Sequence, residues 1–160
     1  MPKPAHPPFA STSVAKEDIY FIGRNIDYAT SLEGSLKLKE ISYIHSECYA
    51  AGELKHGSIA LIDEGTPVIA VVTEKNIAEK TISNIKEVKA RGAYVILVTT
   101  NDIDTDIDFY DKKIVIDNLH KLSSPILTTV PLQLLSYEIA KLRGCDIDQP
   151  RNLAKSVTVE

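Results

Sequence analysis

A single lysine, Lys155, stands in the polar carboxyl-terminal sequence QPRNLAKSVTVE, which is too polar to build a core of its own. A terminal segment that follows a helix can fold back over a pocket, and a primary amine delivered in this way can condense with a ketone to form a Schiff base. The alternative is that the tail frays, as most chain termini do, and that Lys155 is an ordinary solvated lysine. The residue types alone leave both interpretations open.

A second candidate set consists of Glu33, Lys37 and Glu40, which are spaced i, i+4 and i+7. On a helix these three side chains project from one stripe. A carboxylate held beside an amine can act as a tuned proton carrier. The competing interpretation is a solvated helix face, on which each ion pair contributes only a few tenths of a kcal/mol. Spacing alone is compatible with both.

The third candidate, His56, lies in the sequence AAGELKHGS, which is flanked by glycines and is too polar for a core helix. Imidazole has an unperturbed pKa of about 6.5, which suits general acid–base catalysis at neutral pH. A loop histidine is also a common surface residue. Of the other histidines, His6 lies in a proline-rich arm, and we expect His45 to end a helix and His120 to lie in a loop.

Length and composition indicate one globular domain, because 160 residues with 44% hydrophobic and 25% charged residues are ordinary for such a protein. A net charge of -4 and a pI near 5.6 argue against nucleic-acid or anionic-membrane partners. No apolar run suits a membrane helix or a signal peptide, which predicts a cytoplasmic protein. Cys48 and Cys145 lack the spacing of a zinc site, so we expect reduced thiols and no metal.

Apolar runs and helical periodicity alternate along the chain, which predicts a parallel sheet in a three-layer α/β sandwich. The first 18 residues are a proline-rich arm that disfavours both helix and sheet. Asp27 is expected to cap the first helix. The predicted strands are residues 19–22, 59–62, 68–72, 94–98 and 113–116, and the predicted helices are residues 27–45, 78–90 and 125–142.

In such a sheet, ligands lie beyond the carboxyl ends of the strands, here near residues 23–25, Thr73 and residues 99–101. The loop after the first strand reads GRN and lacks the Gly-x-Gly-x-x-Gly pattern that carries a pyrophosphate. We therefore expect no dinucleotide cofactor, and nothing else in the sequence points to another cofactor.

Three stretches, EGSLKLKEISYIHSECYAAGELKHG, VPLQLLSYEIAKLRG and DQPRNLAKSVTVE, together resemble the carboxyl-terminal sugar isomerase (SIS) domain of the glutamine:fructose-6-phosphate amidotransferases, also called glucosamine-6-phosphate synthases. The resemblance runs over residues 19–160. It implies a five-stranded parallel sheet of flavodoxin-like type, with an SIS domain at residues 19–144 and an active-site tail at residues 145–160. In that family, fructose 6-phosphate and glutamine give glucosamine 6-phosphate and glutamate.

The resemblance also implies a role for each candidate residue. Lys155, in the NLAKS motif, forms the imine with the open-chain sugar, and Ala154 contacts the substrate through its backbone. Glu40, at the end of LKLKE, moves the proton between C1 and C2 and also contacts the substrate, while Lys37 assists proton movement at the sugar hydroxyls. His56, in GELKHG, opens the sugar ring across a dimer interface, which implies a homodimer.

The chain departs from the family pattern in ways that shape the predicted function. Ser58 replaces the proline that usually follows the His-Gly pair, which loosens the loop that holds His56. The chain also lacks the Ser/Thr-rich phosphate loop of a first SIS domain and the glutaminase domain with its terminal cysteine. The predicted function is therefore that of the second isomerase domain, incomplete when alone. The alternative is a non-catalytic module for sugar-phosphate binding or dimerisation.

Overall fold

The computed structural model of the protein describes residues 17–105, 107–117, 120 and 123–153. Within these residues, five parallel strands form one sheet in the order β2-β1-β3-β4-β5. The strands are β1 (Asp18–Gly23), β2 (His45–Ala50), β3 (Pro67–Val72), β4 (Tyr94–Thr100) and β5 (Lys112–Ile116).

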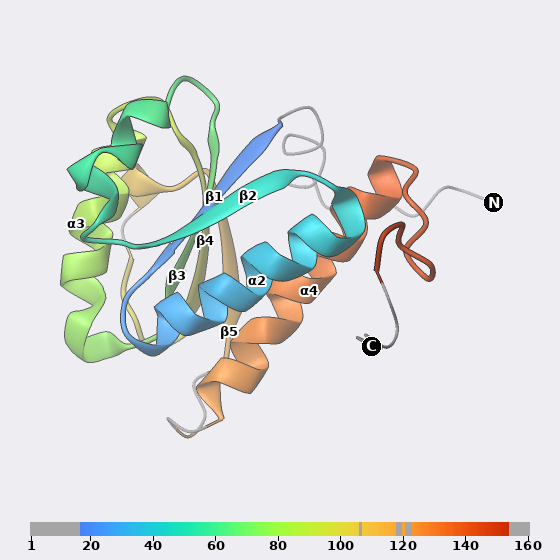
Figure 1. Ribbon diagram of the computed structural model, residues 1–160. Coiled ribbons are helices and arrows are strands. Elements are labelled where there is room, and N and C mark those ends of the chain that lie inside the picture. Colours follow the sequence, from blue (N-terminus) through green and yellow to red (C-terminus); the bar gives the residue numbers. More distant parts are fainter. Residues whose placement is uncertain (1–16, 106, 118–119, 121–122, 154–160) are drawn as a thin grey trace, which may run out of the picture.

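Helices cover both faces of this sheet (Figure 1). The helices α2 (Ile26–Ser42) and α4 (Ser124–Leu142) lie side by side on one face, and α3 (Ala78–Lys89) lies on the other. The predicted three-layer α/β sandwich with a five-stranded parallel sheet is confirmed. The strand order is that of flavodoxin-like sheets, in which the chain reverses its direction of winding between β1 and β3.

The core has two halves because each strand sends alternate side chains to opposite faces. All six residues of the central strand β3 are buried, which explains why its sequence PVIAVV is an unbroken apolar run. Phe21, Ile69 and Ile96 pack under α2 and α4, whereas Ile22 and Leu97 pack under α3.

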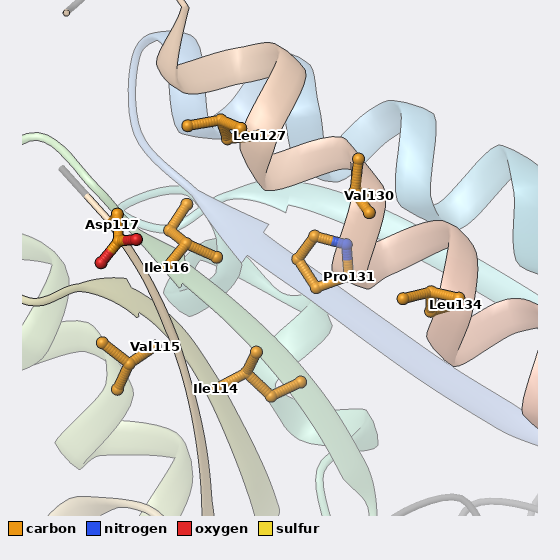
Figure 2. A pocket seen from close by; sticks show the side chains of 8 residues that line it. All are labelled: Ile114, Val115, Ile116, Asp117, Leu127, Val130, Pro131 and Leu134. Atoms are coloured by element: carbon orange, nitrogen blue, oxygen red, sulfur yellow. The ribbon is translucent and has the colours of Figure 1, made fainter. Parts of the chain in front are cut away.

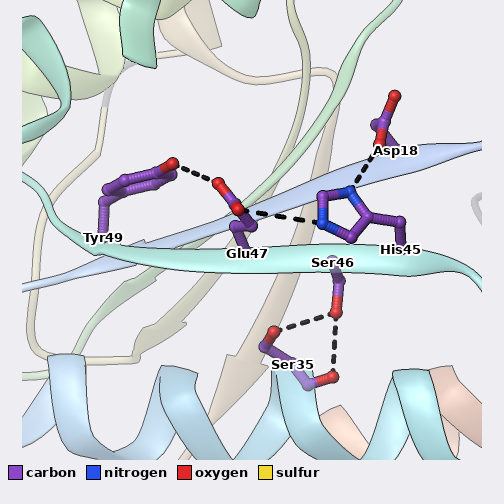
Figure 3. A network of polar contacts seen from close by, with 6 residues as sticks. All are labelled: Asp18, Ser35, His45, Ser46, Glu47 and Tyr49. Atoms are coloured by element: carbon purple, nitrogen blue, oxygen red, sulfur yellow. Dashed lines mark hydrogen bonds and ion pairs between the residues drawn. The ribbon is translucent and has the colours of Figure 1, made fainter. Parts of the chain in front are cut away.

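Two small-residue contacts fix the position of α2. A Cβ atom on Gly34 would lie 2.9 Å from Leu132 Cδ1 and 3.0 Å from the Phe21 ring, so glycine lets α4 approach closely. On the other flank, the hydroxyls of Ser35 and Ser46 hydrogen bond at 2.8 Å, and Ser46 Oγ also donates to the Ser35 carbonyl at 2.8 Å (Figure 3). The helix is thereby held against both α4 and the edge strand β2.

The structure corrects the prediction of a helix that continues to His45. The helix α2 ends at Ser42, and Tyr43 adopts a left-handed conformation with φ 60° that stops it. The next residues form β2, which begins at His45, so this histidine opens a strand instead of ending a helix. Asp27 is not the helix cap either, because it lies in the first turn and Asn25 occupies the cap position.

The predicted strand at residues 59–62 is also wrong. This stretch lies in a short 3-10 helix, η2 (Ser58–Leu61), which follows another, η1 (Leu54–His56). Short apolar runs do not distinguish a strand from a helical turn by periodicity alone. The expected strands at residues 19–22, 68–72, 94–98 and 113–116 are confirmed, as are the helices at residues 78–90 and 125–142, each within two residues at either end.

Candidate active site

The charged stripe predicted on the first helix, which consists of Glu33, Lys37 and Glu40, is present in the second half of α2. Lys37 Nζ lies 2.7 Å from Glu40 Oε2 and 3.7 Å from Glu33 Oε1. The hydrogen bond to Glu40 raises the pKa of Lys37, the charges of Glu40 and Glu33 raise it further, and partial burial opposes them. Lys37 therefore stays protonated at neutral pH, as a charged donor beside the Glu40 carboxylate.

His56 lies at the end of η1, in the loop that follows β2. The buried side chain of Leu54 anchors this loop, while Lys55 and His56 are exposed. The backbone N–H of His56 donates to the Glu53 carbonyl at 3.0 Å. Ser58, in place of the proline that the resemblance leads one to expect, opens η2. The imidazole is thus presented to solvent by a loop whose backbone is fixed.

Within one copy of the chain, Glu40 lies near the amino end of β2 and His56 lies beyond its carboxyl end. Glu40 comes five residues before the start of β2, and His56 comes six residues after its end. A six-residue strand spans about 20 Å. The fold therefore brings Lys37 and Glu40 together but keeps His56 away from them.

The segment after α4 turns back toward the end of α2 (Figure 1). Gly144 is left-handed with φ 70°, and the N–H of Cys145 donates to the Ala140 carbonyl at 3.0 Å, which is the pattern of a Schellman helix end. The Asp146 carboxylate then accepts a hydrogen bond from the Gln149 N–H at 2.9 Å. These turns reverse the direction of the chain.

The returning segment docks on Tyr43. The backbone N–H of Arg151 donates to the Tyr43 hydroxyl at 2.8 Å, and the Arg151 guanidinium lies 4.2 Å from the centre of the Tyr43 ring. Tyr43 follows Glu40 by three residues, so the tail approaches the end of α2 that carries the charged stripe. The predicted site residues Ala154 and Lys155 lie outside the described residues.

A buried carboxylate occupies the edge of the sheet where ligands were expected. Asp27 is 2% exposed, and its Oδ2 accepts hydrogen bonds from the backbone N–H groups of Thr73 at 2.8 Å and Glu74 at 3.4 Å. Its Oδ1 accepts one from the Thr73 hydroxyl. Burial raises the pKa of Asp27, and these hydrogen bonds lower it in part. The Asp27 side chain therefore joins the first turn of α2 to the loop after β3.

A polar row on β2 was missed by the sequence analysis (Figure 3). His45 Nδ1 lies 2.6 Å from Asp18 Oδ1, its Nε2 lies 3.7 Å from Glu47 Oε1, and the Tyr49 hydroxyl donates to Glu47. This last hydrogen bond is the largest cause of a raised pKa at Tyr49. The signal was the alternation His-x-Glu-x-Tyr, which is typical of an edge strand with one polar face.

The described residues do not contain a group of three or more His, Cys, Asp or Glu side chains that could hold a metal ion. Cys48 and Cys145 do not form a disulfide. Burial raises the pKa of the Cys48 thiol to about 12, so it is not a nucleophile at neutral pH. No helix in the described ranges is long and apolar enough to cross a membrane.

The chain is similar to a known protein family over most of its length. Residues 13–143 match the SIS domain family. The chain belongs to this family. Its match to the SIS domain covers all five strands and the three α-helices α2, α3 and α4.

Relatives of this SIS domain include much longer proteins. The glutamine–fructose-6-phosphate aminotransferase (isomerizing) of Caldanaerobacter subterraneus subsp. tengcongensis is 57% identical over 152 residues, which are 95% of this chain and 25% of that protein. The enzyme of the same name from Methanosarcina acetivorans is 58% identical over 142 residues, which are 88% of this chain and 23% of that protein. The chain thus spans about a quarter of the length of these relatives.

A solved structure supports the same relationship. The C-terminal domain of glucosamine-fructose-6-phosphate aminotransferase from Francisella tularensis superposes with a TM-score of 0.81 at 43% sequence identity. The match covers 88% of this chain and 40% of that domain. The SIS domain described here is therefore similar to one part of a larger C-terminal domain.

Proposed function

We propose that this chain is the second sugar isomerase domain of a glucosamine-6-phosphate synthase. It would convert fructose 6-phosphate, held as an imine, toward glucosamine 6-phosphate. The observation that carries the proposal is the 2.7 Å contact between Lys37 and Glu40, at the end of α2 on which the tail leading to Lys155 docks. The relatives named above carry the same activity in their names.

The chemistry follows from the groups available. The Lys155 amine attacks the C2 carbonyl of the open-chain sugar, and water leaves as the imine forms. Ammonia, which glutamine hydrolysis in another domain would supply, then displaces the Lys155 amine from C2 and leaves the imine of ammonia in its place. The protonated imine withdraws electrons from C1, so its hydrogen becomes acidic. The Glu40 carboxylate takes the proton from C1 and returns it to C2, which converts the ketose into the aldose form. Lys37, held protonated by Glu40, donates to a sugar hydroxyl, and the backbone of Ala154 contacts the substrate.

Trapping the imine tests this proposal. The folded chain is incubated with millimolar fructose 6-phosphate and a hydride reductant, and the adduct is located by peptide mass. We expect an adduct on Lys155 that Lys155→Arg abolishes, because a guanidinium does not form imines. Lys141→Arg, on the exposed end of α4, is the matched control and should keep the adduct. Binding of the sugar phosphate without any adduct would instead support a non-catalytic module.

We also propose a homodimer in which His56 serves the site of the partner copy. The separation of His56 from Glu40 within one copy supports this arrangement, because a side chain beyond the opposite end of β2 reaches a substrate on Glu40 most simply from a second copy. His56 would then open the sugar ring as an acid and base at a site whose other groups belong to its neighbour.

Mixing two inactive variants tests the shared site. His56→Ala and Glu40→Gln should each be inactive in ring opening or proton transfer. If the site is shared, random exchange of subunits gives mixed dimers with one intact site, and about a quarter of the wild-type isomerisation rate should return. No recovery from a mixture that light scattering shows to be dimeric would place both residues in one copy, and a monomer at high concentration would exclude the dimer.

A further proposal is that other domains of a longer protein complete the substrate site, namely a first SIS domain and a glutaminase domain. An apolar groove of about 490 Å³ between β5 and α4 supports additional packing on this domain (Figure 2). Val115, Val130 and Leu134 at this groove are each about half exposed, so the groove offers apolar surface on which another domain could pack.

We place the protein in the cytoplasm, without nucleic-acid or membrane partners. The two cysteines without a disulfide fit a reducing compartment. The net charge of -4 gives no excess of positive charge for binding polyanions.

A further inference from the structure

Tyr43 has a backbone conformation that its residue type disfavours. With φ 60° and ψ 18° it lies in the left-handed region, at the position after α2 where glycine is usual. For an aromatic residue this conformation is unfavourable, because the Cβ atom lies close to the following carbonyl oxygen. Its N–H closes the helix by donating to the Lys39 carbonyl at 3.2 Å, which a glycine would do equally well. We therefore expect the Tyr43 side chain to make a stabilising contact that glycine cannot make.

The segment that follows α4 makes this contact with Tyr43 through Arg151. The Tyr43 hydroxyl accepts the backbone N–H of Arg151 at 2.8 Å, and the Tyr43 ring lies 4.2 Å below the Arg151 guanidinium. At the preceding residue of α2, the Ser42 carbonyl accepts a hydrogen bond from Cys145 Sγ at 3.8 Å. The tail is thus attached at two adjacent positions at the end of α2, first where it leaves α4 and again at Arg151.

We propose that Tyr43 is a positioning residue that anchors the carboxyl-terminal tail and so sets the approach of Lys155 to Glu40. The inference rests on the proposed function for the role of Lys155, but the anchoring itself does not. From Arg151, four residues reach at most about 14 Å, whereas the ten residues from Cys145 reach about 35 Å. The accessible volume scales as the cube of this reach and grows about 16-fold, so releasing Arg151 should lower the local concentration of the Lys155 amine by roughly an order of magnitude.

The anchoring is tested by trypsin cleavage after Arg151 in the full chain. Trypsin needs the arginine side chain free, so its contact with Tyr43 should protect the bond. We expect Tyr43→Gly to be cleaved there about tenfold faster than the wild type, with an unchanged or higher melting temperature because glycine relieves the left-handed strain. Tyr43→Phe keeps the ring and should restore part of the protection. Cleavage of Tyr43→Gly at the wild-type rate would overturn the proposal.

The consequence for Lys155 is tested by trapping the sugar imine in the same variants. Tyr43→Gly should form the adduct on Lys155 about tenfold more slowly, and Tyr43→Phe should recover part of the rate. Tyr137→Ala, which removes a tyrosine beside Lys141 on α4, should change neither cleavage nor trapping. Faster cleavage with wild-type trapping would overturn the positioning role. Absence of an adduct in the wild type would instead contradict the proposed function, while the cleavage result still decides whether Tyr43 anchors the tail.

Discussion

Replacing Glu40 with glutamine is expected to slow the exchange of the C1 hydrogen of fructose 6-phosphate with solvent by at least about 100-fold. Glutamine has nearly the same size and helix propensity, but it does not accept a proton from carbon. It also removes the charged partner that lies 2.7 Å from Lys37 Nζ, so the pKa of Lys37 should fall toward its ordinary value. Loss of the C1 proton signal in deuterium oxide, followed by NMR, measures the exchange.

Two matched variants distinguish proton transfer by the Glu40 carboxylate from a general effect of negative charge on α2. Glu33→Gln removes the weaker partner of Lys37, at 3.7 Å, and should lower the rate less than about tenfold. Glu79→Gln changes a carboxylate on α3, on the opposite face of the sheet, and should have no effect. Equal losses in Glu33→Gln and Glu40→Gln would mean that the net charge of the stripe, and not the Glu40 carboxylate, matters for the reaction.

Replacing Asp27 with alanine is expected to lower the free energy of unfolding by about 3 kcal/mol. The side chain is 2% exposed, and its loss leaves two backbone N–H groups and the Thr73 hydroxyl without their acceptor. The first turn of α2 and the loop after β3 would then be joined less firmly. Urea unfolding of the wild type and the variant gives the difference directly.

The loss of unfolding free energy in Asp27→Ala should depend on pH, in a direction set by the raised pKa of Asp27. A raised pKa means that the folded state favours the protonated carboxyl. The stabilisation from Asp27 is therefore complete below the unfolded value of 3.8 and declines as pH rises through the folded value. The difference between the wild type and Asp27→Ala should be largest in acid. Asp27→Asn should cost less and remove this pH dependence, and a difference that grows with pH would contradict the assignment.

The buried parts of the fold could be predicted from the sequence because they leave a simple pattern. The strands β3 and β4 are covered on both faces, so their sequences are continuous apolar runs. The strand β2 was not predicted because it is an edge strand with the polar residues His45, Glu47 and Tyr49 on one face, so its sequence lacks a continuous apolar run. Ile44, three residues after Ile41, also continued the helical pattern past Ser42, the last residue of α2.

The candidate site was predictable only where its geometry is local. Helical spacing places Glu33, Lys37 and Glu40 on one stripe, and the structure adds that Glu40 lies closer to Lys37 than Glu33 does. The contact between Tyr43 and Arg151 joins residues 108 positions apart, and the contact between Asp27 and Thr73 joins residues 46 positions apart. No periodicity encodes such contacts, because they arise when separate loops meet in the folded chain.

The buried Asp27 has a consequence for how the domain behaves before assembly. Its carboxylate already occupies the loop amides that an anionic ligand would use at this edge of the sheet, so a phosphate would have to displace it. On the proposed function, the phosphate of the sugar must then be held by another domain. A free copy would carry the reactive groups but bind the sugar phosphate weakly, so association with that domain would raise the rate at low substrate concentration.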